Sequence, residues 1–318
     1  MDPRQHFVLV ISTGGTIAST TDSSGARVPT LSCEELVHRC GTAERVRTYD
    51  AASLDSSSVS LAEVDMLRGL VRKALDDANV TGIVITHGTD SMADTALALD
   101  LVHDDPRPVV LTGAQRPADA DSAGDGTSPD GPDGPDNLRR AIELAADPLR
   151  RGQGVLVHFG GDTLPARGMY KAHTEQLRAF ALTSDRPLPR PAAVPHAPLA
   201  DLRIPVLAAW PGADAALTDA VVDSHPDGIV VAALGSGNVS EAMGQALARA
   251  SEAGIPVVIS TSVPRGEVSL AYGGAGGGST LGEKGAYSAG FLRPGQARMA
   301  LATALASGVD PAILLGTR

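Results

Sequence analysis

The alternation of short apolar runs with longer helical patterns most constrains the fold of this 318-residue chain. Strand-length runs occur as FVLVIS at 7–12, GIVITH at 82–87, PVVLTG at 108–113 and GVLVHFG at 154–160. Segments with helical spacing of apolar residues lie between them, at 61–78, 92–102 and 137–147. Buried parallel strands are near-continuous apolar runs, and each needs a crossover helix to reach the next strand. The sequence therefore predicts an α/β fold in which helices cover both faces of a parallel sheet.

A proline-rich stretch, RPLPRPAAVPHAPLADLRIP at 186–205, interrupts this alternation. Its many prolines oppose helices and strands, which makes it the best candidate for a linker. The alternation resumes with an apolar run at 228–235, a helical segment at 240–254, another run at 255–261 and a final helix at 294–308. We therefore expect a larger N-terminal α/β domain over 1–190, a linker over 191–212 and a smaller C-terminal α/β domain over 213–318.

Acidic residues outnumber basic ones by 37 to 26, and much of the excess lies in one segment. This segment, PADADSAGDGTSPDGPDGPDN at 117–137, is rich in Asp, Gly and Pro, a composition typical of a disordered surface insertion. An acidic chain without a basic patch is unlike a nucleic-acid binder. We therefore expect no nucleic-acid partner.

Features of a membrane, secreted or metal-binding protein are missing from the sequence. Its apolar runs are far shorter than the ~20 residues of a membrane span, and MDPRQHFVLVIS at 1–12 lacks a signal-peptide core. Cys33, His38 and Cys40 match no familiar zinc spacing, and both cysteines share one face of a helix expected over 32–40. We therefore expect buried thiols, no metal, no membrane contact and a cytoplasmic location.

The segment ISTGGTIAST at 11–20, directly after the start of the first apolar run, permits two kinds of chemistry. Its glycines can cradle a phosphate, or they can form a tight turn that presents Thr16 as a nucleophile. A Walker loop requires a lysine and a dinucleotide fingerprint requires G-x-G-x-x-G, and the segment has neither. GSGNVS at 235–240 is closer to the fingerprint but ends in serine, so a strand-to-helix turn is the simpler interpretation.

A threonine nucleophile needs a base and a group that holds the base. Thr89 and Asp90 follow the second apolar run, in THGTD, and Lys171 follows the fourth run. Ligands of open α/β sheets bind beyond the carboxyl ends of the strands, so these residues and Thr16 can face one crevice. His87 of the same motif is favoured as a structural histidine, because no G-x-S-x-G serine accompanies it. Spacing alone leaves the threonine hypothesis open.

Six segments form a longer pattern. They are TGGTIAS at 13–19, THGTDSMADTA at 86–96, VLTGAQRP at 110–117, DGPDNL at 133–138, ARGMYKAHT at 166–174 and GSGN at 235–238. In this order they resemble the signatures of the bacterial-type L-asparaginase family, and the resemblance extends from residue 8 to about residue 305. It implies hydrolysis of the side-chain amide of L-asparagine to L-aspartate and ammonia, without a cofactor.

The resemblance also implies catalytic roles. Thr16 matches a nucleophilic threonine on a mobile N-terminal loop, so the following residues, 17–30, are expected to form a flexible lid. Thr89, Asp90 and Lys171 match a second group, in which the lysine and the aspartate activate a threonine hydroxyl or a water.

Substrate contacts and assembly are implied in the same way. Ser56 and Ser57, in LDSSSV, match two positions that help to hold the substrate. Asp90 would pair with the α-ammonium group, and the backbone of Ala114 would bind the amide. Asn238 matches a residue that reaches the site of a neighbouring subunit, so the resemblance implies a homotetramer built from intimate dimers.

The sequence departs from the family pattern at two places. The family has a tyrosine shortly after the nucleophile, whereas DSSGARVPT at 22–30 contains no aromatic residue. The acidic residue that a neighbouring subunit contributes is missing between Tyr272 and Ser279, where Tyr272 or Glu283 can substitute. Both departures bear on the activation of Thr16 and on discrimination against glutamine. A glutaminase-asparaginase of broader specificity, and a non-catalytic amino-acid sensor that kept the pocket, remain alternatives.

Overall fold

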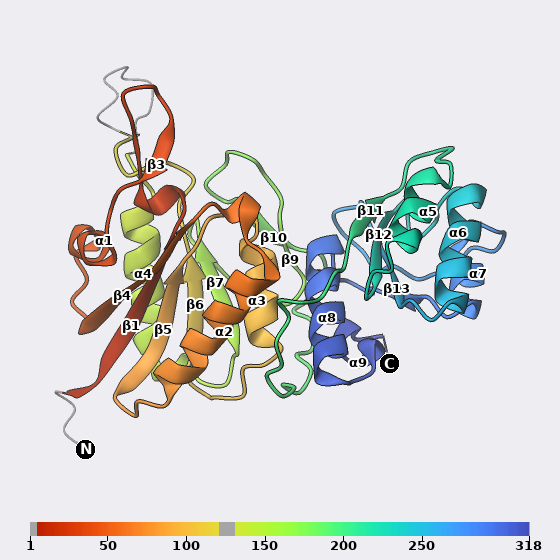
Figure 1. Cartoon of the computed structure of the whole chain (residues 1–318). Coiled ribbons are helices and arrows are strands. Elements are labelled where there is room, and N and C mark those ends of the chain that lie inside the picture. The colour runs from red at the N-terminus through yellow and green to blue at the C-terminus, as the bar shows by residue number, and fades with distance from the viewer. Residues whose placement is uncertain (1–4, 121–130, 318) are drawn as a thin grey trace. The chain divides into compact units, whose positions relative to one another are not determined.

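The computed structural model describes residues 5–120 and 131–317 and divides the chain into two compact units. The first unit comprises Met1–Ala166 and Lys171–Ala181, and the second comprises Arg167–Tyr170 and Leu182–Arg318. Each unit has its own sheet, with helices packed against it (Figure 1). This confirms the expected fold class, a larger N-terminal part built on a parallel sheet followed by a smaller α/β part.

The first unit contains a six-stranded sheet in the order β4-β1-β5-β6-β7-β8. The strands are β1 (Phe7–Gly14), β4 (Val46–Leu54), β5 (Val80–Thr86), β6 (Val109–Thr112), β7 (Val155–Phe159) and β8 (Asp162–Pro165). All neighbours pair in parallel except β7 and β8, which are antiparallel. The four apolar runs of the sequence form the inner strands, as predicted. The edge strands β4 and β8 were not predicted, because their residues are mostly exposed or half-buried and form no apolar run.

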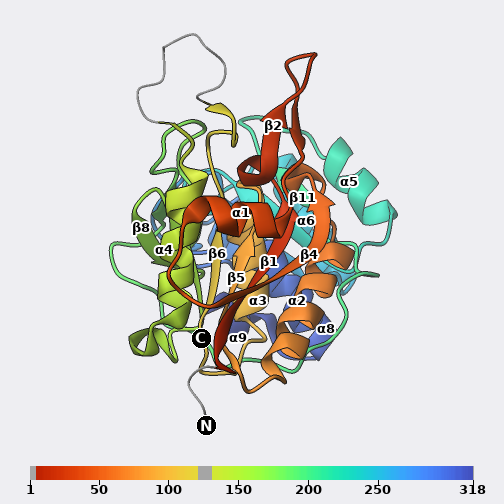
Figure 2. The ribbon, with the colours of Figure 1, turned by 90° about the vertical axis from the view of Figure 1, so that its left-hand side faces the viewer.

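Helices cover both faces of this sheet, as expected (Figure 2). They are α1 (Cys33–Cys40), α2 (Leu61–Leu75), α3 (Met92–Asp100) and α4 (Gly134–Ala146). Helices α1 and α4 share one core cluster with β1, while α2 packs on α3 at the other face. Serines begin two of the helices, since Ser32 and Ser60 each form a capping box with a glutamate three residues later.

The two cysteines are the first and last residues of α1, and both are buried. Cys33 and Cys40 are free and buried, as predicted, and the Cys33 thiol donates to the carbonyl of Val10 over 3.4 Å. Burial raises the pKa of the Cys33 thiol to about 11, which keeps it protonated and a poor metal ligand. Among the residues that the structure describes, no three His, Cys, Asp or Glu side chains form a group that could hold a metal.

The second unit contains a four-stranded parallel sheet in the order β11-β12-β13-β14. Its elements are β11 (Val206–Ala208), α5 (Ala216–Asp223), β12 (Ile229–Ala233), α6 (Glu241–Glu252), β13 (Val257–Thr261), α7 (Gly278–Glu283), β14 (Tyr287–Ser288), α8 (Pro294–Ser307) and α9 (Pro311–Leu315). The predicted runs and helices correspond to β12, α6, β13 and α8. Residues 183–205 contain no helix or strand, in keeping with their prolines. Domain boundaries at 190 and 213 stay a prediction.

The segment after β1 forms a hairpin. A short 3-10 helix, η2 (Thr16–Ala18), leads into β2 (Ser19–Thr21), which pairs antiparallel with β3 (Arg27–Pro29). This hairpin extends beyond the end of the sheet (Figure 1 and Figure 2). The remaining short elements are η3 (Ser56–Ser58), η5 (Pro148–Arg150), β9 (Met169–Lys171) and β10 (Phe180–Leu182), and β9 pairs with β10 in a separate two-stranded sheet.

The disordered insertion predicted over 117–137 is wrong at both of its ends, and its middle, 121–130, lies outside the described residues. At one end, the backbone N–H of Ala118 donates to the carbonyl of Ser19, and the Asp119 carboxylate accepts from the backbone N–H of Thr21 over 2.8 Å. At the other end, α4 begins at Gly134 with a proline in its first turn. Asp, Gly and Pro are common in disordered segments, but they also begin helices, and here the helix start prevails.

Within 5–120 and 131–317, every helix is too short or too polar to span a bilayer.

Candidate active site

Three loops meet beyond the carboxyl ends of adjacent strands in the first unit. They follow β1 (Gly14 to Thr16), β4 (residues 55–58) and β5 (residues 87–90). Glycines permit their close approach: a Cβ atom added to Gly15 would lie 2.7 Å from the backbone nitrogen of Gly88. A Cβ added to Gly88 would lie 2.5 Å from the Cβ of Ser56. The two threonine motifs therefore pack backbone against backbone, and the Ser56 side chain packs against the backbone of Gly88.

The two glycines of TGGT form the tight turn that the sequence left open. Gly14 has φ of 92°, and Gly15 has φ of 81° and ψ of −179°, a conformation that glycine alone adopts readily. The chain leaves β1 through this turn and enters η2 at Thr16, which is half-buried while Ile17 and Ala18 enter the core. The turn thus sets Thr16 beside the THGTD loop.

Lys171, Thr89 and Asp90, three of the residues predicted for the site, are in contact. The Lys171 ammonium donates to the Thr89 hydroxyl over 2.8 Å and to Oδ1 of Asp90 over 2.7 Å. Thr89 is 8% exposed, whereas the Asp90 side chain is 56% exposed. An ion pair this accessible to water stabilises the fold by at most about 1 kcal/mol. Its main effect is therefore to orient the lysine toward the threonine hydroxyl.

The two candidate serines have different surroundings. Ser56 is buried, its hydroxyl accepts from the backbone N–H of Asp90 over 3.3 Å, and its carbonyl accepts from the Ser91 hydroxyl over 2.6 Å. Ser57 is exposed, and its hydroxyl donates to the Asp55 carboxylate over 2.9 Å. Ser56 thus supports the turn that carries Thr89 and Asp90, while Ser57 lies at the surface of the same loop.

His87 has the surroundings of a structural histidine. It is buried, and its Nδ1 lies 2.8 Å from the carbonyl oxygen of Gly88. Burial lowers the pKa of His87 and so favours the neutral ring. Within the described part of the chain, no hydrogen bond joins it to Thr89 or Lys171, which agrees with its assignment as a structural residue.

The other two predicted substrate-binding residues lie in different units. Ala114 is buried in the loop after β6 of the first unit. Asn238 belongs to the second unit, in the turn between β12 and α6, where its Oδ1 accepts from the backbone N–H of Gly278 over 3.4 Å. Tyr272, which is 62% exposed, and Glu283 of α7 also belong to the second unit.

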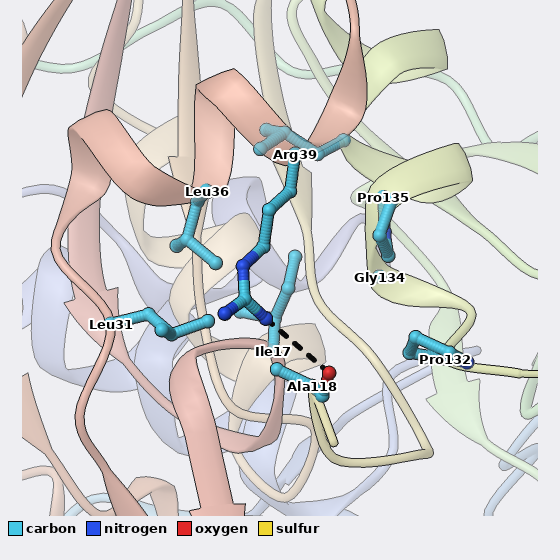
Figure 3. A pocket seen from close by; sticks show the side chains of 9 residues that line it. Ile17, Leu31, Leu36, Arg39, Ala118, Pro132, Gly134 and Pro135 are labelled. Carbon is cyan, nitrogen blue, oxygen red and sulfur yellow. Dashed lines mark hydrogen bonds between the residues drawn. The ribbon is translucent and has the colours of Figure 1, made fainter. Parts of the chain in front are cut away.

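A small cavity lies at the base of the hairpin (Figure 3). It has a volume of about 170 Å³ and is lined by Ile17, Leu31, Leu36, Arg39, Ala118, Pro132, Gly134, Pro135 and Leu138. The Arg39 guanidinium donates to the carbonyl of Ala118 at its edge over 3.4 Å. A zwitterionic amino acid needs charged partners of both signs. The cavity offers one arginine and no acid, and none of the predicted catalytic residues lines it.

Gly15→Ala tests the contact between the two threonine motifs. We expect it to lower the free energy of unfolding by about 2 kcal/mol more than Gly25→Ala, because alanine at 15 also overlaps the backbone of Gly88. Gly25 is the matched control, since it has φ of 86° and open space around its Cβ position. Urea denaturation of both variants gives the comparison. Equal losses would show that the loops do not pack as closely as described.

Two family models match the chain. The one described as "Asparaginase, N-terminal" matches residues 7–194, and the one described as "Glutaminase/Asparaginase C-terminal domain" matches residues 203–314. An L-asparaginase of Bacillus licheniformis is 31% identical over 318 residues, which cover 94% of this chain and 95% of that protein. A probable L-asparaginase of Deinococcus radiodurans is 33% identical over 319 residues, covering 95% and 93%.

A solved structure extends this likeness to the fold. A probable cytoplasmic L-asparaginase from Campylobacter jejuni is 26% identical and superposes with a TM-score of 0.81, covering 98% of both chains. The family models and the relatives extend over both units, and they include the threonine loops and Lys171. The chain therefore belongs to the asparaginase family.

Proposed function

We propose that this chain is an L-asparaginase, which hydrolyses the side-chain amide of L-asparagine to L-aspartate and ammonia. The observation that carries the proposal is the contact of Lys171 with Thr89 and Asp90 at 2.8 and 2.7 Å. A hydroxyl beside an amine, with a carboxylate that orients the amine, is an arrangement suited to moving protons during amide hydrolysis. The family and the relatives named L-asparaginase support the same reaction.

The reaction requires two displacements at one carbon. Thr16 Oγ1 attacks the amide carbon and its proton goes to the departing nitrogen, so that the C–N bond breaks and ammonia leaves. The product of this half is an aspartyl ester of Thr16. Water then attacks the ester carbon, the C–O bond breaks, and Thr16 regains its proton. Thr89 and Lys171 are assigned to transfer these protons, since their 2.8 Å contact is within the range over which a proton can move.

Substrate binding is assigned to the loops around these groups. A carboxylate can accept several hydrogen bonds, so Asp90 can bind the substrate ammonium while it holds Lys171. Ser56 and Ser57, on the neighbouring loop, are assigned to help hold the substrate, and the backbone of Ala114 is assigned to the amide. The negative charge of Asp90 and the positive charge of Lys171, held at fixed positions, would select a small zwitterion.

The assembly and the location follow from the same resemblance. We assign a homotetramer built from intimate dimers, in which Asn238 of one subunit reaches the site of its neighbour. A cytoplasmic location is supported by the likeness to a chain described as a probable cytoplasmic L-asparaginase. The reaction is assigned without a cofactor.

An ammonia assay tests the function directly. Purified protein is incubated with L-asparagine, L-glutamine and D-asparagine in parallel, and ammonia is measured for each. We expect release from L-asparagine with the highest kcat/KM. Comparable kcat/KM for L-glutamine would favour a glutaminase-asparaginase. Binding of L-asparagine by calorimetry with no ammonia release would favour an amino-acid sensor and refute the enzyme.

A further inference from the structure

The strand that carries Lys171 lies outside the main sheet. Lys171 is the last residue of β9, which pairs with β10 in a separate two-stranded sheet. Thr89, in contrast, follows β5 of the six-stranded sheet. The hydrogen bonds of the main sheet therefore do not set the position of Lys171 relative to Thr89. Another contact must hold the two sheets in register at this point, because proton transfer depends on short distances.

Gln115 makes such a contact. It follows β6 of the main sheet, and its side-chain Nε2 donates to the carbonyls of Thr174 and Gln176, over 3.1 Å in each case. Both carbonyls belong to the turn that directly follows Lys171. One amide group thus joins the loop containing Ala114 to the segment containing the lysine.

The two carbonyls that Gln115 contacts belong to a hydrogen-bonded turn. Nδ1 of His173 accepts from the backbone N–H groups of Glu175 and Gln176 over 3.0 and 2.9 Å. The backbone N–H groups of Ala172 and His173 donate to the carbonyl of Ala179. A displacement of the carbonyls of Thr174 and Gln176 would therefore also move the backbone of β9 and Lys171.

The loop that carries Gln115 is held by residues at the start of α4. The Asp133 carboxylate accepts from the backbone N–H groups of Gln115 and Arg116, over 3.1 and 2.9 Å. The Asn137 side chain donates to the carbonyl of Gly113 over 3.0 Å and to Asp133 over 3.1 Å. Asp133 is the N-cap residue of α4, but its side chain makes no cap hydrogen bond and accepts from the neighbouring loop instead. Hydrogen bonds thus hold the residues on both sides of Ala114, and they fix the backbone of Gln115.

We propose that Gln115 is a positioning residue that sets Lys171 against Thr89, through its two hydrogen bonds to the turn after Lys171. The proposal rests on the proposed amide hydrolysis for its kinetic effect, but the geometry it concerns is independent of the substrate. Gln115 acts through the backbone and takes no part in bond making. Its loss should therefore lower kcat more than it changes KM.

Gln115→Met and Gln115→Glu test the proposal. Methionine keeps the length of the side chain and removes its donor, so kcat with L-asparagine should fall about tenfold while KM stays within about twofold. Gln153→Met is the matched control, since the side chain of Gln153 also donates to a carbonyl, that of Leu149, but at a surface turn outside the site. It should retain the kcat of the unmodified enzyme.

Gln115→Glu adds a pH signature that loss of stability would not produce. A protonated carboxyl can donate one hydrogen bond to these carbonyls, whereas a carboxylate can donate none. The ratio of its kcat to that of the unmodified enzyme should therefore rise as the pH falls from about 7 to about 5, toward the glutamate pKa. The same ratio for Gln115→Met should stay constant. Wild-type kcat in Gln115→Met, or a constant ratio for Gln115→Glu, would overturn the proposal.

A crystal structure of Gln115→Met separates this proposal from the proposed function. We expect the distance from Lys171 Nζ to Thr89 Oγ1 to exceed 3.5 Å, the limit of a hydrogen bond. An unchanged distance overturns the positioning role, whatever the unmodified protein does with asparagine. Absence of ammonia release by the unmodified protein refutes the enzyme function and leaves this structural comparison valid.

Discussion

Lys171→Met should lower kcat for asparagine hydrolysis by about 10³-fold, within the range for loss of a group that transfers protons. The Lys171 side chain donates a hydrogen bond to the Thr89 hydroxyl, and methionine keeps its length without its nitrogen. Initial rates of ammonia release measure the effect. Lys73→Met is the matched control, because Lys73 is exposed in the last turn of α2, on a segment that carries no site residue. It should leave kcat unchanged.

Lys171→Arg distinguishes proton transfer from simple charge. A guanidinium keeps the positive charge beside Asp90, but it does not lose its proton in proteins. If Lys171 accepts a proton, the arginine variant should be nearly as slow as the methionine variant. Recovery of most of the activity by arginine would mean that only the charge matters. Near-normal activity of the methionine variant would refute the assigned mechanism.

Thr16→Ala should abolish turnover, with a loss in kcat of at least about 10³-fold, because it removes the atom assigned to attack the amide. Thr16→Ser keeps a hydroxyl and should retain activity within about tenfold of the unmodified enzyme. Thr20→Ala is the matched control on the same hairpin, where the Thr20 hydroxyl contacts only that of Thr30 among the described residues. It should retain full activity and so exclude general damage to the hairpin.

Mass spectrometry can identify the residue that carries the covalent intermediate. Reactions quenched in acid during turnover should yield an aspartyl ester on the peptide that contains Thr16, as detected by mass spectrometry. The same ester on the peptide containing Thr89 would exchange the assigned roles of the two threonines. High activity of Thr16→Ala would likewise exchange the assigned roles of the two threonines.

The segment after Thr16 lacks the tyrosine that the family resemblance leads us to expect. The hairpin residues 22–30 contain no aromatic side chain, and all of them are exposed. The turn itself instead holds the Thr16 segment close to the THGTD loop, since Gly15 packs on the backbone of Gly88. The hairpin is also attached to the chain before α4, where Asp119 accepts from the backbone of Thr21. These contacts hold the segment that carries Thr16, the proposed nucleophile, although that segment lacks the expected tyrosine.

Prediction from the sequence succeeded where burial leaves a strong pattern. The inner strands β1, β5, β6 and β7 are buried on both faces, so their sequences are continuous apolar runs. It failed at the edges, because β4 contains VRTYDAASL, a segment of mostly exposed or half-buried residues that resembles a loop. It also failed at the start of α4, where a Pro- and Asp-rich segment was interpreted as part of a disordered insertion.

For the candidate site, the sequence by itself determined that both threonine motifs lie at the carboxyl end of the sheet. This is possible because the carboxyl ends of neighbouring parallel strands share one edge, and because both threonine motifs follow buried strands. It could not determine distances between groups. Lys171 lies 82 residues beyond Thr89 in the chain and on a different sheet, and only the tertiary structure brings their side chains to 2.8 Å. The contacts of Gln115 and Asp133 that hold these loops together leave no pattern in the local sequence. Long-range hydrogen bonds depend on how loops pack, whereas apolar periodicity depends only on which face of an element is buried.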